Sequence, residues 1–222
     1  MHYRDNDRLP PKGHLSKLTT KHVARMNLGK YAQAKFGEIE EGVVKDRLRS
    51  FIANMREFVI KGFGLYIHGD YGSGKTHAAA VILKQACIRG YSCYLVQAAD
   101  LASLKITKGT FDSEQSLWDR LTNVHFLVID DLGKEHDSEW AQNSIVNLLR
   151  ERNRRANSVT LMTSNLAYIP GDTRSGFARR YGRDTQDLMD DLVVPLKMDR
   201  LESYRLSRAG KMKDLLHAKR KD

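Results

Sequence analysis

A glycine-rich stretch, Gly69-Asp70-Tyr71-Gly72-Ser73-Gly74-Lys75-Thr76, constrains this chain more than any other feature. It fits the pattern G-x-x-x-x-G-K-[ST] of the phosphate-binding P-loop. The apolar run 63–68 before it predicts a strand, and the run 77–86 after it predicts a helix that ends at Gly90. Because a P-loop joins a strand to a helix, the flanks agree with the motif. The alternative is a glycine-rich turn that binds nothing.

The chemistry of a P-loop assigns a role to its residues. Glycine at 69, 72 and 74 allows a tight turn whose N–H groups point at phosphate oxygens. The positive end of the following helix adds to this attraction. Lys75 is expected to reach the β- and γ-phosphates, and the Thr76 hydroxyl is expected to bind Mg²⁺.

A second motif, Phe126-Leu127-Val128-Ile129-Asp130-Asp131, is an apolar run that ends in two carboxylates, the Walker B pattern. A fully apolar strand belongs inside a parallel sheet, and ligands bind at the carboxyl ends of such strands. Asp130 is expected to hold Mg²⁺, directly or through water. Asp131 stands where a carboxylate can polarise the attacking water. The alternative is a strand followed by a turn-forming aspartate pair.

A polar end also follows the strand predicted at 158–163. There Asn165 can touch the γ-phosphate or the attacking water, whereas in isolation it would indicate a simple turn. Further strands are predicted at 91–97 and 192–196. Because Pro195 lacks an N–H group, the latter should be an edge strand or the end of one. Helices are predicted at 42–60, at 139–156 after a Ser138 cap, and after an N-cap at Asp100.

Composition limits the class of protein. With 222 residues and 41% apolar content, the chain is long enough for one α/β domain with short extensions. No apolar run reaches the length of a membrane span, so no membrane partner is expected. Cys87 and Cys93 form no metal-type or redox-type pair, which favours a reducing, cytoplasmic setting.

The net charge of +10 is concentrated at the two ends. Residues 1–35 carry eight Lys/Arg against two acids, a net +6, and residues 197–222 carry nine against four, a net +5. The residues between them have a net charge of −1. Two basic ends indicate nucleic-acid phosphates as a partner, and solvated tails that aid solubility are the alternative.

With these elements in this order, the chain resembles the AAA+ ATPases of the DnaC/DnaI/IstB type, which are helicase loaders and transposition helper ATPases. The resemblance covers about residues 25–208. Asn165 corresponds to the sensor 1 residue of that family. The residues that carry the resemblance are 69–77, including His77, 126–135, Leu161-Met162-Thr163-Ser164-Asn165-Leu166 and Glu202-Ser203-Tyr204-Arg205.

This resemblance implies a fold and a domain plan. The fold is an α/β P-loop NTPase with three αβα layers and a mainly parallel five-stranded sheet, its lid domain reduced or absent. Residues 1–40 would be a basic extension that binds a partner or DNA, 41–208 the ATPase domain, and 209–222 a basic tail. The implied nucleotide-binding residues are 69–77, and the implied cofactors are ATP and Mg²⁺.

The resemblance also implies a task, the loading of a hexameric replicative DNA helicase onto single-stranded DNA. It implies a homo-oligomer in which an arginine of one copy reaches the ATP of its neighbour. Arg179 and Arg183 offer the expected spacing, although a rival alignment places 188–191 there and puts an aspartate where arginine is expected. Asp131 also departs from the family, which often has glutamate, so slow hydrolysis is expected.

Two other functions remain as alternatives. An IstB-like transposition helper would bind duplex DNA and regulate a transposase. A small-molecule kinase would also use a P-loop, but a phosphoacceptor site and an arginine-bearing lid are not evident, whereas a sensor-like Asn165 is.

Overall fold

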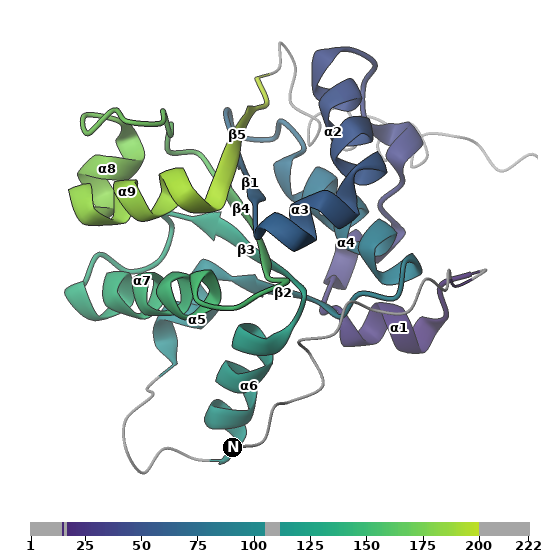
Figure 1. Cartoon of the computed structure of the whole chain (residues 1–222), viewed down its shortest axis with the longest axis horizontal. Helices are drawn as coiled ribbons and strands as arrows, with labels where there is room; N and C mark the ends of the chain where they lie inside the picture. Colours follow the sequence, from purple (N-terminus) through teal and green to yellow (C-terminus); the bar gives the residue numbers. More distant parts are fainter. Residues whose placement is uncertain (1–14, 16, 105–111, 200–222) are drawn as a thin grey trace, which may run out of the picture.

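A parallel sheet lies at the centre of the computed structural model, which describes residues 15, 17–104 and 112–199 (Figure 1). Its five strands have the order β2-β3-β4-β1-β5, and all neighbouring strands are parallel. The strands are β1 Gly64–His68, β2 Cys93–Gln97, β3 Phe126–Leu132, β4 Val159–Ser164 and β5 Val193–Lys197. The predicted five-stranded α/β fold is confirmed, and β5 is an edge strand, as Pro195 predicted.

Helices cover both faces of the sheet, which gives the three layers that were predicted. Alternate strand residues face opposite layers, so Leu65 and Ile67 pack on one side and Tyr66 on the other. One layer holds α1 Thr20–Arg25, α2 Val43–Ala53, α3 Met55–Lys61 and α4 Lys75–Ile88, with the 3₁₀ turns Gly29–Gln33 and Phe36–Glu38. The other holds α5 Ala98–Ser103, α6 Asp112–Asn123, α7 Glu139–Asn153, α8 Gly176–Tyr181 and α9 Arg183–Leu192.

The single helix predicted at 42–60 is wrong, because two helices occupy this segment. They meet at Asn54, whose side-chain amide and backbone N–H both donate to the Ser50 carbonyl, at 2.9 and 3.0 Å. A side chain that competes for a backbone acceptor favours a helix end. The second helix stops at Gly62, which has a left-handed conformation with φ of 73°.

N-caps were predicted for two helices, at Ser138 and at Asp100, and the structure can be compared with both. The Ser138 cap is confirmed, since its hydroxyl accepts a hydrogen bond of 3.2 Å from the Ala141 N–H. The Asp100 cap is wrong, because α5 begins one residue after Gln97 and places Asp100 in its first turn. There the carboxylate still favours the helix, since it lies near the positive end of the helix dipole.

The outer edge of β2 is covered by a segment near the start of the described chain. The Leu95 N–H donates to the Met26 carbonyl at 3.0 Å, and the Asn27 side-chain amide donates to the Leu95 carbonyl at 2.9 Å. Met26, Leu28, Ala34 and Ile39 are buried in the core beside α4. The second half of residues 1–40 therefore packs on the domain, while the role of this segment in binding stays a prediction.

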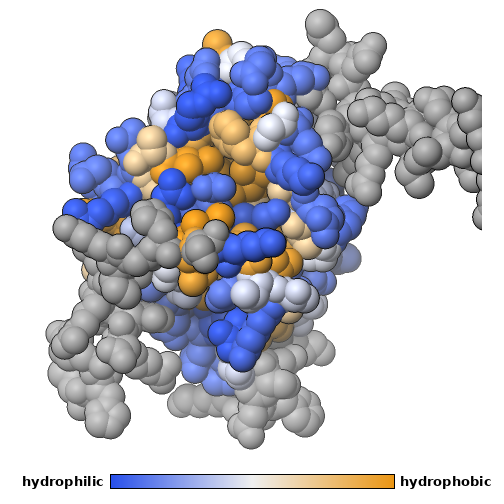
Figure 2. Space-filling model, turned by 90° about the vertical axis from the view of Figure 1, so that its right-hand side faces the viewer, coloured by the Kyte–Doolittle hydropathy of each residue, from blue (hydrophilic) through white to orange (hydrophobic). Residues whose placement is uncertain are grey.

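The face formed by the N-terminal helices is mainly hydrophilic, with apolar side chains gathered in its middle (Figure 2). Within the described residues, no helix combines the length and the apolar character that crossing a bilayer requires. The predicted tail 209–222 and the signature 202–205 lie outside the described residues.

Candidate nucleotide site

The P-loop is a turn of unusual backbone conformation between β1 and α4. Gly69 and Gly74 have φ of 139° and 89°, values that side-chain-bearing residues rarely adopt. A Cβ atom on Gly69 would lie only 2.3 Å from the Met198 carbonyl oxygen. Glycine at the start of the motif is therefore required both by the turn and by the close approach of the chain that follows β5.

The N-terminus of α4, which lies at this turn, offers backbone N–H donors. Its first hydrogen bond runs from the Ala78 N–H to the Gly74 carbonyl, at 2.9 Å. The N–H groups of residues before Ala78 are thus not used by the helix itself, and they lie at the positive end of its dipole. This is the donor arrangement that binds phosphate oxygens.

Lys75 lies inside the turn. Its ammonium donates to the carbonyls of Gly69 and Asp70, at 2.9 and 2.6 Å, and is 3.4 Å from the Ser73 hydroxyl. The residue is only 6% exposed. A buried cation surrounded by neutral acceptors can exchange them for phosphate oxygens, as the P-loop motif requires.

Asp130 is held between two neighbouring strands. One carboxylate oxygen accepts a 2.5 Å hydrogen bond from the Thr163 hydroxyl of β4, and the other accepts a 2.7 Å bond from the Gln97 amide of β2. Asp130 is 1% exposed. Each oxygen keeps a further lone pair, so this oriented carboxylate can still accept a bond from water or a cation.

Asp131 differs from its neighbour in backbone and exposure. Its φ of 58° is left-handed, and the pairing of β3 with β4 shifts register between Ile129 and Leu132. Its carboxylate is partly exposed and forms a 2.8 Å ion pair with Lys134, whose ammonium lies 5.5 Å from the centre of the Tyr71 ring. The two adjacent carboxylates therefore have separate environments, one buried and fixed, the other accessible.

Asn165 lines an open cleft beside the start of the P-loop. The cleft has a volume of about 500 Å³, and Lys197 lies at it in an ion pair with Asp199. Burial lowers the pKa of His68 at the end of β1, which favours the neutral ring near pH 7. The lining residues are His68, Gly69, Asp70, Asn165, Ala167, Lys197 and Asp199. The structure thus brings Asn165 to the P-loop.

A smaller pocket of about 200 Å³ adjoins the other side of the P-loop. Its walls are residues 38–44, the P-loop residues Ser73 and Gly74, and Met198 after β5. The ring of His77 also lines it, and its Nε2 lies 3.0 Å from the Lys35 carbonyl oxygen. The His77 side chain therefore contacts the N-terminal segment.

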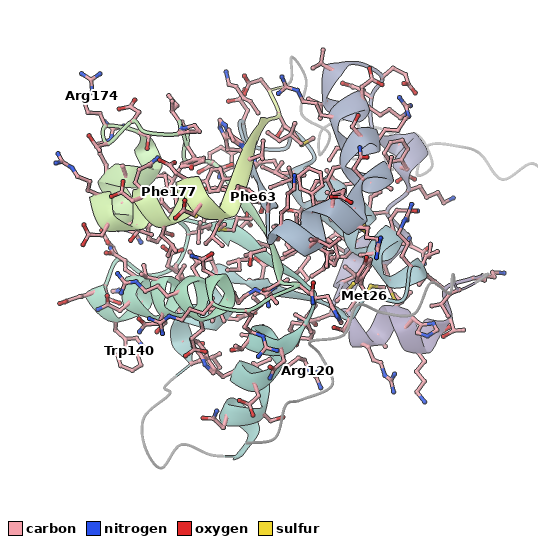
Figure 3. The ribbon with its side chains drawn as sticks, in the orientation of Figure 1. Met26, Phe63, Arg120, Trp140, Arg174 and Phe177 are labelled. Carbon is pink, nitrogen blue, oxygen red and sulfur yellow. The ribbon has the colours of Figure 1, made fainter. Side chains whose placement is uncertain are left out.

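The arginine-rich segment forms α8 and the start of α9, and its arginines at 179, 180 and 183 differ in their contacts. Arg179 and Arg183 are exposed, and neither forms an ion pair with any described residue. Arg180 instead bonds the Glu135 carbonyl at 3.0 Å and its carboxylate at 3.3 Å, and pairs with Asp137. Figure 3 shows Arg174 pointing away from this end of the molecule, whereas Phe177 lies inside.

Glu135 belongs to this α8 contact. Its carboxylate accepts a 2.6 Å hydrogen bond from the Tyr181 hydroxyl and a 2.8 Å bond from the Gly133 N–H. Burial and this hydrogen bond raise the pKa of Tyr181, so the hydroxyl keeps its proton and donates it. Burial alone would lower the pKa of Arg180, but the charge of Glu135 raises it. Glu135 is therefore a structural anchor.

Asp190, one of the two aspartates in the segment 188–191 of the rival alignment, forms hydrogen bonds that hold the fold together. It accepts hydrogen bonds from the Tyr168 hydroxyl and from the Gly171 N–H, the latter at 3.0 Å. These bonds fasten α9 to the loop after β4. Helix α9 presents an acidic group to its own domain here, and the exposed cations lie at Arg179 and Arg183.

The described residues suit a nucleotide and a magnesium ion. The turn supplies backbone donors and a buried ammonium for phosphates, as shown above. Thr76, on the first turn of α4, and Asp130 carry oxygen atoms of the hard type that Mg²⁺ prefers, and these two residues would hold the ion. No cluster of three or more His, Cys, Asp or Glu that could hold a metal ion occurs among the described residues.

A protein-family model matches the sequence that forms this site. The model described as IstB-like ATP binding protein matches residues 7–177. The chain belongs to this family. Its P-loop and the strand ending in Asp130 both lie within the matched residues.

Relatives with known names agree with this assignment. The replicative helicase loader DnaC of Buchnera aphidicola subsp. Baizongia pistaciae is 32% identical over 129 residues, 56% of this chain and 48% of its own length. The loader DnaI of Bacillus subtilis is 26% identical over 150 residues, 63% of this chain and 47% of its own. The chain thus spans about half the length of the curated relatives it matches.

Solved structures show the same fold. A crystal structure of the DnaC helicase loader has a TM-score of 0.64 and 27% identity, over 76% of this chain and 98% of that one. AMPPCP-bound DnaA from Aquifex aeolicus has a TM-score of 0.58 at 17% identity, over 85% of this chain and 57% of that one. The P-loop AAA+ fold is therefore established for this chain.

Two contacts of Asp130 were not predicted. Thr163 stood within a predicted strand and Gln97 at the end of another, and neither was assigned a role. A polar residue at the carboxyl end of a strand next to β3 was the available signal, and it was used only for Asn165.

Proposed function

We propose that this chain is an ATPase that loads a hexameric replicative DNA helicase onto single-stranded DNA. One observation carries the ATPase half, namely the convergence of the P-loop, the Asp130–Asp131 pair and Asn165 at the carboxyl edge of one sheet. The loading half rests on similarity to proteins named as helicase loaders, DnaC and DnaI.

Each residue of the site has a proposed task. Lys75 would leave the carbonyls of Gly69 and Asp70 for phosphate oxygens, and Thr76 and Asp130 would hold Mg²⁺. That ion would neutralise charge on the phosphates. Asp131 would accept the proton of the attacking water, with Asn165 orienting that water or the γ-phosphate.

In this proposal the two pockets hold different parts of the nucleotide. The phosphates would face the open cleft at Asn165, and the base would enter the smaller pocket beside residues 38–44. Apolar side chains of Ile39, Val44 and Met198 line that pocket and suit the faces of a purine ring.

Assembly would complete the site. The exposed Arg179 and Arg183 would reach the nucleotide of a neighbouring copy, so ATP hydrolysis would require a homo-oligomer. The basic ends, residues 1–40 and 209–222, are proposed to contact DNA or the helicase.

The test is a binding experiment with the replicative helicase encoded by the same genome. The full chain should retain the helicase and a single-stranded oligonucleotide when ATP is present, and Lys75→Ala should not. If the chain binds ATP but ignores the helicase under all nucleotide conditions, the loading proposal fails.

The IstB-like family model favours one second candidate, a transposition helper. That function predicts ATP-dependent binding of duplex DNA and capture of a transposase. Comparing the affinities for single-stranded and duplex oligonucleotides of equal length separates the two.

A further inference from the structure

We propose that Thr163 is a positioning residue that sets the geometry of both carboxylates of the site. This inference rests on the proposed function, because it concerns how the site is held ready for Mg²⁺ and water. It begins from one hydroxyl that bonds two adjacent residues of another strand. The Thr163 Oγ1 donates to the Asp130 carboxylate at 2.5 Å and accepts from the Asp131 N–H at 2.9 Å.

The directions of these two bonds are fixed by chemistry. A hydroxyl has one proton to donate, and an ionised carboxylate can only accept. The proton of Thr163 therefore points to Asp130, and a lone pair receives the Asp131 N–H. Thr163 is 0% exposed, so solvent does not compete for either bond.

The bond from the Asp131 N–H to Thr163 lies where the regular pairing of β3 with β4 is interrupted. The register of β3 against β4 shifts between Ile129 and Leu132, and Asp131 lies within this irregular stretch. Its left-handed backbone is costly for a residue with a side chain. The Thr163 hydroxyl satisfies the Asp131 N–H and so holds the conformation that separates an accessible Asp131 from a buried Asp130.

The bond to Asp130 is one arm of a clamp. Gln97 of β2 donates to the other oxygen at 2.7 Å, so both neighbouring strands orient this carboxylate. Of these two arms, Thr163 is the one that also bonds Asp131. Loss of Thr163 should therefore disturb both carboxylates, whereas loss of Gln97 should disturb Asp130 alone.

Groups that orient a metal ligand affect metal affinity or activity about 10-fold to 100-fold when they are removed. Thr163→Val keeps the shape of the side chain and removes both bonds. We expect it to lower the Mg²⁺-dependent gain in affinity for a fluorescent ATP analogue at least tenfold. Affinity measured without Mg²⁺ should be unchanged, because the P-loop donors are intact. The rate constant kcat should fall more than KM rises, since Asp131 is also displaced.

A matched control lies on the same strand. Thr160 is 1% exposed, and its hydroxyl accepts a 2.8 Å bond from the buried guanidinium of Arg152. Thr160→Val makes the same chemical change three residues before Thr163, at a hydroxyl that bonds Arg152 and not the carboxylates. It should lower thermal stability and leave the Mg²⁺-dependent gain unchanged. Thr163→Ser retains the hydroxyl and should restore most of that gain.

The outcomes separate the two proposals. If the wild-type chain binds no nucleotide, the proposed function fails. If it binds nucleotide and Thr163→Val keeps the full Mg²⁺-dependent gain, or loses no more than Thr160→Val, the role of Thr163 is refuted. Should Thr163→Val not fold, Thr163→Ala and Thr163→Ser decide instead. Equal losses of the Mg²⁺-dependent gain in these two would refute the role of the hydroxyl.

Discussion

The carboxyl end of β3 and the junction of α8 with α9 both gather charged side chains, and they hold them in opposite ways. Asp130 is buried and bonded by two neighbouring strands, whereas Arg179 and Arg183 are exposed and have no ion-pair partner among the described residues. Fixed groups around reacting atoms need little reorganisation during reaction. This difference fits our proposal that each copy holds its own acidic groups in place and offers its exposed arginines to a neighbouring copy.

Arg180 makes the contrast sharper within one short helix. It lies next to Arg179, yet it bonds Glu135 and Asp137 of its own domain. Its side chain is 17% exposed and that of Glu135 is 0% exposed. Adjacent arginines can thus serve the fold and the proposed interface separately.

Removal of the two exposed arginines should have the largest effect on activity. Arg179→Ala combined with Arg183→Ala should lower kcat for ATP about 10,000-fold, the scale of an arginine that acts from a neighbouring copy. Mixing this variant with Lys75→Ala copies should restore hydrolysis, because those copies still supply both arginines. Steady-state ATPase assays measure both effects. Arg174→Ala is the control, and a mixture that stays inactive would argue against action between copies.

The accessible carboxylate is tested next. Asp131→Asn should bind ATP normally and lower kcat about 1,000-fold, within the range for loss of a general base. Glu135→Gln removes a nearby acid that is committed to α8, so it should mainly lower thermal stability. Single-turnover hydrolysis and thermal melting distinguish the two. Full activity of Asp131→Asn would move the base to another residue.

Replacing the P-loop lysine should have a smaller effect, which should appear in the affinity for ATP. Lys75→Ala removes charge-assisted hydrogen bonds worth about 3 kcal/mol, equivalent to roughly 100-fold in the dissociation constant for ATP. Titration with a fluorescent ATP analogue measures this change. The variant should melt near the wild-type temperature, because the hydrogen bonds of the lysine to the Gly69 and Asp70 carbonyls lie within one loop. Unchanged affinity would contradict the assignment of the whole site.

The smallest expected effect concerns stability alone. Arg180→Ala leaves the buried Glu135 with fewer partners and should lower the free energy of unfolding by about 2 kcal/mol. Arg179→Ala should change it by less than about 0.5 kcal/mol, as is usual for exposed residues. Urea unfolding of both variants measures the difference. Equal losses would erase the distinction between the two arginines.

Features encoded by a short stretch of sequence were predicted better than features that depend on contacts between distant residues. The P-loop, the strand ending in Asp130 and the edge position of β5 are each carried by a few consecutive residues, and the structure agrees with them. The clamp on Asp130 depends on three strands meeting in one register, which no single stretch reveals. Likewise, the His77 ring contacts Lys35, which is 42 residues away in the chain.

The segment after β4 shows a different limit. The helices α8 and α9 in this segment were not predicted from its glycines and arginines. They are held by buried contacts with the core, such as those of Phe177 and Met189. The predicted helix at 42–60 failed because a single asparagine side chain outweighed a continuous apolar pattern. Tertiary packing and local side-chain bonding decided both cases.

The contact of Met26 and Asn27 with β2 has a consequence for laboratory use of this protein. An open strand edge is a template for aggregation. A shortened form that starts after Asn27 would uncover Leu95 and could precipitate for reasons unrelated to any partner. A shortened form that begins at Thr19, which caps the first helix, keeps Met26 and Asn27 on the edge of β2. Comparing it with the full chain tests the role of the basic residues before Thr19.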